Sequence, residues 1–512
     1  MTQPTTLSNN TICAISTPAG VGGIAVARVS GAQAIEIVDK LWHGKRALAE
    51  APTHTAHFGQ IIDPLNGEML DEAVATVFRA PRSFTGEEVV EIAVHGSLWV
   101  QRELINLLIR NGCRLAEPGE FTRRAFASGK MDLAEAEAVA DVIASTSRAA
   151  HRVAISQMRG NFSRRLSQLR DSLLDLAALL ELELDFSEEE VEFADRAHLL
   201  NLSNETLREV TRLANTFATG DAIRRGIPVA IIGQPNVGKS SILNLLTGDD
   251  RAIVSDIPGT TRDTVEDTVD IDGYTFRFID TAGLRDTTDL VENLGIDRAW
   301  AKIAEARIIL WVITPDTPGH EIAEFANTLA ARRNPDAKTI LILNKADLLP
   351  HSGDTNSSTP LTPDSSLHTF QSHVTTEKSG VTTPHTEQPA DISAGAPAPT
   401  HPNCDYTLTL SALTGHGHTT LRHTLVKAAT AELATAPDTT DAIIVTNARH
   451  YQALTSAADS LRRVIDALTA NLPGDLVAQD VRETIHHLSA ITGTITAPDI
   501  LATIFSRFCI GK

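Results

Sequence analysis

A strand-like run followed by a glycine-rich loop is the feature of this sequence that most clearly carries chemistry. The run IPVAII leads directly into GQPNVGKSS, in which Gly233, Gly238, Lys239 and Ser240 have the spacing of a P-loop. Backbone N–H groups of such a loop and the N-terminus of the next helix bind phosphates, while the lysine reaches the β and γ oxygens and the serine ligates magnesium. The helical run ILNLLT that follows argues against a chance match.

A second strand, YTFRFID, ends in DTAG. Asp280 is then placed to hold magnesium through water, and Gly283 to meet the γ-phosphate. An aspartate at this point is a strand-end cap as often as a ligand. The polar loop SDIPGTTRD lies between the two motifs, and its Thr261 is a candidate for completing the magnesium shell; the alternative is an ordinary exposed loop.

Two later loops carry the signals for base recognition. The strand TILILN leads into NKAD, where the Asp347 carboxylate can accept hydrogen bonds from guanine N1–H and the amino group, donors that adenine lacks as a pair. LTLSAL supplies a strand-end loop that can touch guanine O6. Four motifs in this order predict a GTPase domain and disfavour an ATP-using kinase. The predicted GTP-contacting residues are Asn236, Val237, Gly238, Lys239, Ser240, Ser241, Ser255, Asp256, Ile257, Pro258, Gly259, Thr260, Thr261, Asp280, Thr281, Ala282, Gly283, Asn344, Lys345, Ala346, Asp347, Ser411, Ala412 and Leu413.

The residue after DTAG is informative because Leu284 stands where Ras-like GTPases have the glutamine that orients the attacking water. Glu292 is a candidate for that role, although an isolated glutamate is more often a solvated surface residue. The domain offers no obvious arginine finger of its own. Asn236, within the P-loop, could lend its side-chain oxygen to a potassium ion beside the phosphates.

The elements around these loops change character along the chain. Residues 11–126 mix β-rich runs (IAVARV, AVATVF, VVEIAV) with the helical run WVQRELINLLIR, which predicts an α/β domain. Helical patterns follow from about 131. One apolar stripe holds Leu166, Leu169, Leu173, Leu176 and Leu180; a second, after a cap at Asn447, holds Tyr451, Leu454, Ala458, Leu461, Ile465 and Leu468. The pattern indicates one helical domain, discontinuous in sequence, with the nucleotide domain inserted between its halves.

Composition sets broad limits. At roughly 150 residues per domain, 512 residues suggest about three domains. The net charge of −20 argues against a broadly basic nucleic-acid coat but leaves room for a local basic groove. In residues 351–403, 25 of 53 residues are Ser, Thr or Pro, which predicts a disordered insertion. No apolar run is long enough for a bilayer, residues 1–10 do not look like a signal peptide, and the four cysteines have no metal or disulfide spacing, so we expect a cytoplasmic protein.

With these motifs in view, the chain resembles the MnmE (TrmE) family of tRNA-modification GTPases. The resemblance rests on TPAGVGGIAVARVSG, SFTGEEVVEIAVHG, EPGEFTRRAF, GKMDLAEAEAVAD, DFSEEE, SDIPGTTRD and the final FSRFCIGK, and it omits residues 351–403. It implies α/β and α architecture: an N-terminal folate-binding and dimerisation domain (1–127), a discontinuous helical domain (128–222 and 433–512) and an inserted Ras-like, doubly wound P-loop GTPase domain (223–432). It implies a homodimer that acts with the flavoprotein MnmG, in a heterotetramer, at carbon 5 of the wobble uridine of tRNA. The resemblance implies that the group added is aminomethyl or carboxymethylaminomethyl.

The resemblance also assigns ligands by motif. A tetrahydrofolate derivative, in its methylene or formyl form, would contact Arg28, Glu91, Lys130 and Lys512. Potassium would be held by Asn236, Ser255, Ile257 and Thr260, magnesium by Ser240 and Thr261, and the attacking water by Glu292. Cys509 is either a reactive thiol near the folate or a buried structural cysteine. A ribosome-assembly GTPase switch is the alternative that the GTPase motifs alone leave open.

Overall fold

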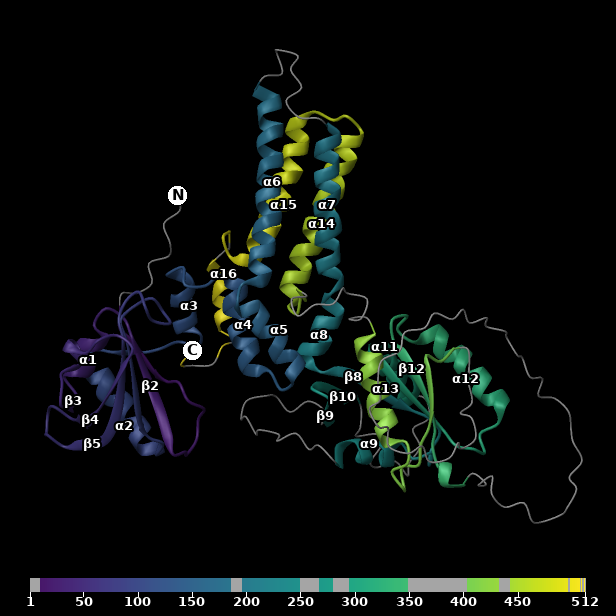
Figure 1. Cartoon of the computed structure of the whole chain (residues 1–512), viewed down its shortest axis with the longest axis horizontal. Helices are drawn as coiled ribbons and strands as arrows, with labels where there is room; N and C mark the ends of the chain where they lie inside the picture. The colour runs from purple at the N-terminus through teal and green to yellow at the C-terminus, as the bar shows by residue number, and fades with distance from the viewer. Residues whose placement is uncertain are drawn as a thin grey trace, which may run out of the picture. The chain divides into compact units, whose positions relative to one another are not determined.

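The computed structural model describes residues 10–185, 196–248, 267–279, 294–348, 403–431, 443–495, 498–506, 508 and 511 (Figure 1). The chain forms two compact units. The first holds residues 1–226, 272–275 and 432–512, and the second holds residues 227–271 and 276–431. Within the described ranges, we find no helix with both the length and the apolar character that a membrane crossing needs.

The first unit begins with a seven-stranded sheet in the order β3-β4-β5-β6-β2-β1-β7. Neighbouring strands are antiparallel except for β1 and β7, which run parallel. One face is buried by helix α2, so alternate residues of the strands point into its core. The strands are β1 (Ile12–Ile15), β2 (Ile24–Ser30), β3 (Trp42–Gly44), β4 (Thr55–Ile62), β5 (Met69–Phe78), β6 (Val89–His95) and β7 (Arg114–Leu115), with helices α1 (Ala34–Asp39), η1 (Leu48–Glu50), α2 (Leu98–Arg110) and α3 (Glu120–Ala127).

The rest of the first unit is helical. Before the nucleotide unit come α4 (Leu133–Ala144), α5 (Arg148–Met158), α6 (Asn161–Asp185), α7 (Arg196–Asn215) and α8 (Phe217–Arg225); after it come α14 (Ala448–Thr469), α15 (Gly474–Thr492) and α16 (Pro498–Phe505). Helix α14 packs on α7 and α15, and α15 packs on α6, so early and late helices share one core (Figure 1). This confirms a helical domain that is discontinuous in sequence.

The two predicted apolar stripes lie on α6 and α14. All five leucines of the first stripe are buried, and so are Leu454, Ala458, Leu461 and Leu468 of the second. Asn447 caps α14, since its side chain accepts a hydrogen bond from the Arg449 backbone N–H at 2.9 Å. Tyr451 differs from the prediction. Its side chain is 40% exposed and stacks on Phe217 of α8, with ring centroids 4.6 Å apart, rather than entering the core.

The second unit is built on a six-stranded sheet in the order β13-β12-β11-β8-β10-β9. From β13 to β10 all strands are parallel. The chain leaves β8 towards β10 on one side and later returns to β11 on the other, which is a topological switch point and confirms the doubly wound arrangement. The strands are β8 (Ile227–Ile232), β9 (Asp267–Ile271), β10 (Tyr274–Ile279), β11 (Ile308–Ile313), β12 (Lys338–Leu343) and β13 (Tyr406–Thr409).

Helices cover both faces of this sheet. All six residues of β11 are buried, as expected for a central parallel strand. Helices α11 (Leu294–Glu305) and α12 (Gly319–Arg332) share a core with β8, β11 and β12. Helix α13 (His418–Thr430) contacts β11, β13 and α9 (Lys239–Gly248). The loops after β8, β12 and β13 therefore meet at the carboxyl edge of the sheet.

Candidate nucleotide-binding site

The loop after β8 has the backbone of a phosphate cradle. Three of its residues have positive φ: Gly233 (147°), Asn236 (63°) and Gly238 (97°). A Cβ atom placed on Gly238 would lie 2.2 Å from Nδ2 of Asn344, so this position requires glycine. The loop feeds straight into the N-terminus of α9, where unpaired backbone N–H groups and the helix dipole favour an anion.

Lys239, the first residue of α9, folds back over this loop. Its Nζ donates to the carbonyl oxygens of Gly233 at 2.9 Å and Gln234 at 2.8 Å. Burial lowers the pKa of Lys239, because removal from water disfavours its charged form. Ser240 and Ser241 follow in the first turn of the helix. The loop and its lysine thus form a pre-shaped site for phosphate oxygens.

Asn344 ties the three loops together. Its Nδ2 donates to the carbonyl of Val237 at 2.7 Å, and its Oδ1 accepts from the backbone N–H of Ala412 at 3.1 Å. The side chain is 2% exposed, so it acts between loops rather than toward solvent. One amide therefore fixes the spacing between the P-loop, the loop after β12 and the loop after β13.

Asp347 and Ser411, the two residues predicted to recognise guanine, lie close together. Ser411 Oγ donates to Asp347 Oδ1 at 2.6 Å, and Ser411 is 1% exposed whereas Asp347 is exposed. The Ala346 backbone N–H donates to Leu410 O at 3.1 Å, which joins the two loops again. The buried hydroxyl orients an accessible carboxylate. Leu413, by contrast, is 86% exposed.

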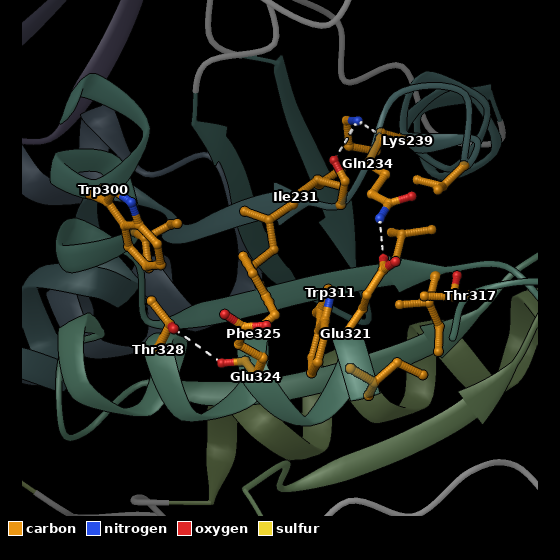
Figure 2. Close-up of a pocket in the computed structure, with 17 residues that line it drawn as sticks. Ile231, Gln234, Lys239, Trp300, Trp311, Thr317, Glu321, Glu324, Phe325 and Thr328 are labelled. Carbon is orange, nitrogen blue, oxygen red and sulfur yellow. Dashed lines mark hydrogen bonds between the residues drawn. The ribbon is translucent and has the colours of Figure 1, made fainter. Parts of the chain in front are cut away.

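A cavity of about 640 Å³ lies beside the P-loop (Figure 2). Lys239 and Gln234 lie at one end, where Gln234 Nε2 donates to Glu321 Oε2 at 2.9 Å, and the rings of Trp300, Trp311 and Phe325 form apolar walls. Neither Asp347 nor Ser411 lines this cavity. The hollow is therefore distinct from the surface where Asp347 is presented.

Three of the four residues predicted for folate lie near Phe84: two on the N-terminal sheet and one after α3. Arg28 on β2 is the register partner of Glu91 on β6, and its Nε donates to Glu91 Oε1 at 2.9 Å. The Arg28 guanidinium lies over the Phe84 ring, 5.3 Å from its centroid. Phe84 also lines a cavity of about 480 Å³ together with Lys130, whose Nζ donates to the Pro81 carbonyl at 3.0 Å. Phe84 thus links Arg28, which carries Glu91 as its ion-pair partner, with the cavity that Lys130 lines.

Comparisons with known proteins were consistent with one another. The family described as "MnmE helical domain" matches residues 133–509, and "GTP-binding protein TrmE N-terminus" matches residues 11–130. Proteins named tRNA modification GTPase MnmE from Bacteroides fragilis and Christiangramia forsetii are each 44% identical to this chain, over 99% and 98% of it and 100% and 99% of their own length. This chain belongs to the MnmE family of tRNA modification GTPases. It is therefore a GTPase.

The helical-domain match of the MnmE family spans both sets of helices and the nucleotide unit between them. Among solved structures, the G domain of the Thermotoga maritima FeoB iron transporter aligns with 40% of this chain and 98% of its own, at 20% identity and a TM-score of 0.22, a likeness too slight to carry an argument.

Several of the residues predicted for this MnmE-family chain lie outside the described residues. They are Ser255, Asp256, Ile257, Pro258, Gly259, Thr260, Thr261, Asp280, Thr281, Ala282, Gly283, Glu292, Cys509 and Lys512, together with the 351–403 insertion except for Asn403.

Sequence reasoning did not single out the aromatic and charged neighbours of Arg28. Phe84 and Phe121 both place their rings near its guanidinium, at 5.3 and 5.7 Å. Close by in the chain, Arg124 is 4% exposed and pairs with Glu87 at 3.1 Å and Glu120 at 3.0 Å. The runs SFTGEEV and EPGEFTRRAF held these residues, and their alternation of aromatic and charged types is the signal that could have found them.

Proposed function

We propose that the three loops bind GTP, with the phosphates on the P-loop and guanine on Asp347. The observation that carries this proposal is the Asn344 side chain, which bonds both the P-loop and the loop after β13. A bound nucleotide must span these loops, so their spacing has to be set in advance. The Asp347 carboxylate is accessible and oriented by Ser411. It matches the two N–H donors of guanine, whereas adenine would leave it incompletely paired.

The phosphate end fits magnesium and GTP. Ser240 is half-buried in the first turn of α9, next to Lys239, which suits a hydroxyl that ligates magnesium beside phosphate oxygens. We assign Thr261 as its partner and Asp280 as a residue acting through water. When bound, magnesium would neutralise charge on the β- and γ-phosphates. Lys239 would hold the same oxygens from the other side.

We also propose that potassium takes the place of an arginine finger. Asn236 has an exposed side chain on the outer bend of the P-loop, which supports its assignment as one ligand. Ser255, Ile257 and Thr260 would complete the site when two GTPase domains meet, and Glu292 would orient the attacking water. The test is GTP turnover in potassium against sodium. Equal rates in the two salts would contradict the potassium proposal.

For the N-terminal domain we propose a tetrahydrofolate site. Arg28 and Lys130 offer cations to the anionic glutamyl tail, and Glu91 offers an acceptor to the donor edge of the pterin. Gly511 accepts a hydrogen bond from Ser16 Oγ at 3.1 Å, which brings the chain to β1 one residue before Lys512 and supports a role for that lysine. Thiol labelling with and without folate tests whether Cys509 is a reactive thiol of this site.

We propose that this GTPase works as a homodimer on tRNA in the cytoplasm, with the flavoprotein MnmG, adding an aminomethyl or carboxymethylaminomethyl group at carbon 5 of the wobble uridine. Exposed apolar side chains on the N-terminal sheet support the homodimer. Phe58 and Val74 are register partners on β4 and β5 and are 65% and 40% exposed. A second copy would cover this pair. The domain limits 1–127, 128–222, 223–432 and 433–512 belong to the same proposal.

Two experiments test the proposal. First, Asp347→Asn should move the base preference from guanine toward xanthine, because the amide presents a donor to the xanthine oxygen; unchanged GTP preference would contradict the assignment of Asp347. Second, mass spectrometry of tRNA nucleosides from cells lacking this chain should show loss of the wobble modification. The alternative, a ribosome-assembly switch, predicts unchanged nucleosides and co-purification with ribosomal particles rather than a flavoprotein.

A further inference from the structure

The cavity beside Phe84 carries positive charge that the folate assignments above use only in part. Its volume is about 480 Å³, and it is lined by His54, Phe78, Arg82, Ser83, Phe84 and Lys130. Two of these side chains, Arg82 and Lys130, are cations at neutral pH, and none of the six lining residues, all in the described part of the chain, is acidic. Such a cavity favours a ligand that combines an aromatic ring with negative charge.

Both cations of this cavity are available to a ligand. Arg82 is exposed, and within the described ranges the structure records neither a hydrogen bond nor an ion pair of its guanidinium. The Lys130 Nζ donates to the neutral carbonyl of Pro81 at 3.0 Å, which leaves its charge uncompensated. Arg28 differs, because Glu91 lies 2.8 Å away and balances its charge. Anionic groups of a ligand are therefore expected at Arg82 and Lys130.

The two loops that carry these cations are joined to each other. The Ser128 hydroxyl, on the loop after α3, donates to the Thr85 carbonyl at 2.7 Å. A Cβ atom on Gly86 would lie 2.8 Å from that hydroxyl oxygen and 3.4 Å from Cγ of Lys130, so glycine lets the two loops approach. The spacing of the loops that carry Arg82 and Lys130 is thus set before a ligand binds, which lowers the entropic cost of binding.

The apolar wall of the cavity continues the sheet face that holds Glu91. Thr76 on β5 is the register partner of Glu91 on β6, and Phe78 lies two residues farther along β5 on the same face. This face is opposite to the buried core, to which Ala75 and Val77 belong. At about 3.4 Å per residue, Phe78 lies roughly 7 Å along the strand from the row that contains Glu91.

Phe84 connects this row with the cavity. Its ring centroid lies 5.3 Å from the guanidinium carbon of Arg28, the partner of Glu91, and the same residue lines the cavity. An elongated ligand can therefore place a polar head at Glu91, an aromatic ring against Phe84 and Phe78, and carboxylates at the two cations.

We propose that Arg82, together with Lys130, binds the carboxylates of the glutamyl chain of folate, and that the site selects folates with more than one glutamate. The inference rests on the proposed function, which supplies a tetrahydrofolate, and it adds a specificity-determining residue. Each further γ-linked glutamate adds one carboxylate, and Arg82 is exposed, so a longer chain gains ionic contacts without entering the cavity more deeply. The planar guanidinium of arginine pairs with a carboxylate through two parallel hydrogen bonds.

The test uses the full chain and two ligands, 5-formyltetrahydrofolate with one glutamate and the same compound with three γ-linked glutamates. Their dissociation constants are measured for the parent and for Arg82→Gln, with circular dichroism to verify folding. We expect the parent to bind the triglutamate about fivefold more tightly, the gain typical of an exposed ion pair, and Arg82→Gln to reduce this ratio to within about twofold. High salt should also reduce the ratio in the parent, because it screens exposed charges.

Two further variants serve as controls. Arg46→Gln removes an exposed arginine of the same domain that does not line the cavity, and it should keep the ratio of the parent. Arg82→Lys keeps the positive charge and should retain part of the preference for the triglutamate. If Arg82→Lys loses the preference as fully as Arg82→Gln does, the ionic explanation is wrong.

The outcomes separate this inference from the folate proposal. A parent that binds both ligands equally well overturns the inference, while the folate proposal survives. The same holds if Arg82→Gln keeps the preference of the parent, or if Arg46→Gln loses it. A parent that binds neither ligand overturns the inference and the folate proposal together.

Discussion

The nucleotide site and the first unit differ in the kind of bond that stabilises each of them internally. In the nucleotide unit, the Asn344 amide joins the three loops through neutral bonds to backbone groups, and one further bond runs from the Ser411 hydroxyl to the Asp347 carboxylate. In the first unit, buried or half-buried ion pairs join distant segments: Arg28 with Glu91, Arg124 with Glu87, and Arg449 and His450 with Glu137.

This difference predicts which change, a substitution or a fall in pH, affects each region most. Neutral hydrogen bonds depend little on pH. A substitution that removes one partner leaves the other partner buried without a hydrogen bond. Ion pairs tie stability to the protonation of their carboxylates. We therefore expect the nucleotide site to respond to loss of single polar groups, and the first unit to respond to acid.

The largest effect should follow from Lys239→Ala, which removes the cation at the phosphate end. GTP hydrolysis is expected to fall about 10³-fold, as when a preorganised charge-stabilising donor is lost. Binding of folate, the ligand proposed for the first unit, should be unchanged. Single-turnover hydrolysis and a folate titration measure the two, with Lys40→Ala, an exposed residue directly after α1, as a charge-matched control. Hydrolysis within tenfold of the parent would contradict the assignment of Lys239.

Glu137→Gln tests the charged side of the comparison. Burial alone would raise the pKa of Glu137, but His450 at 2.7 Å and Arg449 at 2.9 Å outweigh it and lower the pKa to about 2. A folded pKa below the unfolded value of about 4.3 gives stability that is present above pH 4.3 and lost as the pH falls towards 2.

Removing the Glu137 carboxylate leaves Arg449 and His450 without this ion-pair partner. We expect the free energy of unfolding of the first unit to fall by about 3 kcal/mol at pH 7. The difference between variant and parent should shrink below pH 4. Urea denaturation at pH 7, 5 and 3 checks this, and a deficit that is the same at all three pH values would contradict the ionic explanation.

Asn344→Ala tests the neutral side. It leaves the Val237 carbonyl and the Ala412 N–H unpaired in a buried place, at about 1 kcal/mol or more each, so GTP affinity should fall about 30-fold. Isothermal titration with a non-hydrolysable GTP analogue measures the loss at pH 6 and pH 8. The loss of affinity should be the same at pH 6 and at pH 8. Asn327→Ala, on the exposed side of α12, is the control that should bind as the parent does.

The smallest expected effect belongs to Ser411→Ala. Only the hydroxyl that orients Asp347 is removed, so GTP should bind about fivefold more weakly, corresponding to roughly 1 kcal/mol. Preference for guanine over adenine should persist because the carboxylate remains. Competition binding with GTP and ATP provides the measurement, and a complete loss of base preference would show that Ser411 reads the base itself.

Much of the nucleotide unit was predictable because its functional loops follow parallel strands. IPVAII, TILILN and the run around LTL form β8, β12 and β13, and each motif comes directly after its strand. The carboxyl ends of parallel strands share one edge, so the chain order alone brings these motifs together. The leucine stripe of α6 was equally predictable, because residues spaced three and four apart lie on one face of a helix.

Other contacts depend on register and sheet order, which no local pattern encodes. Arg28 meets Glu91 because β2 and β6 pair with a particular register across 63 residues of sequence. Asn344 belongs to a recognisable motif, yet its bond to the Val237 carbonyl requires β12 to lie two strands from β8. Tyr451 fitted the helical spacing but lies at the edge of the stripe, where Phe217 offers a ring to stack on.

The interleaved helical core has a consequence for synthesis on the ribosome. Helices α6 and α7 emerge first, but α14, on which α7 packs, begins about 230 residues after α7 ends. At translation speeds of about 5–20 residues per second, their apolar faces wait roughly 10–50 s for α14 and α15. The nucleotide unit, whose segments are contiguous apart from a short turn, is complete before that partner arrives. The GTP-binding unit is thus complete while α6 and α7 still lack α14 and α15. The nascent chain needs protection from aggregation during that interval.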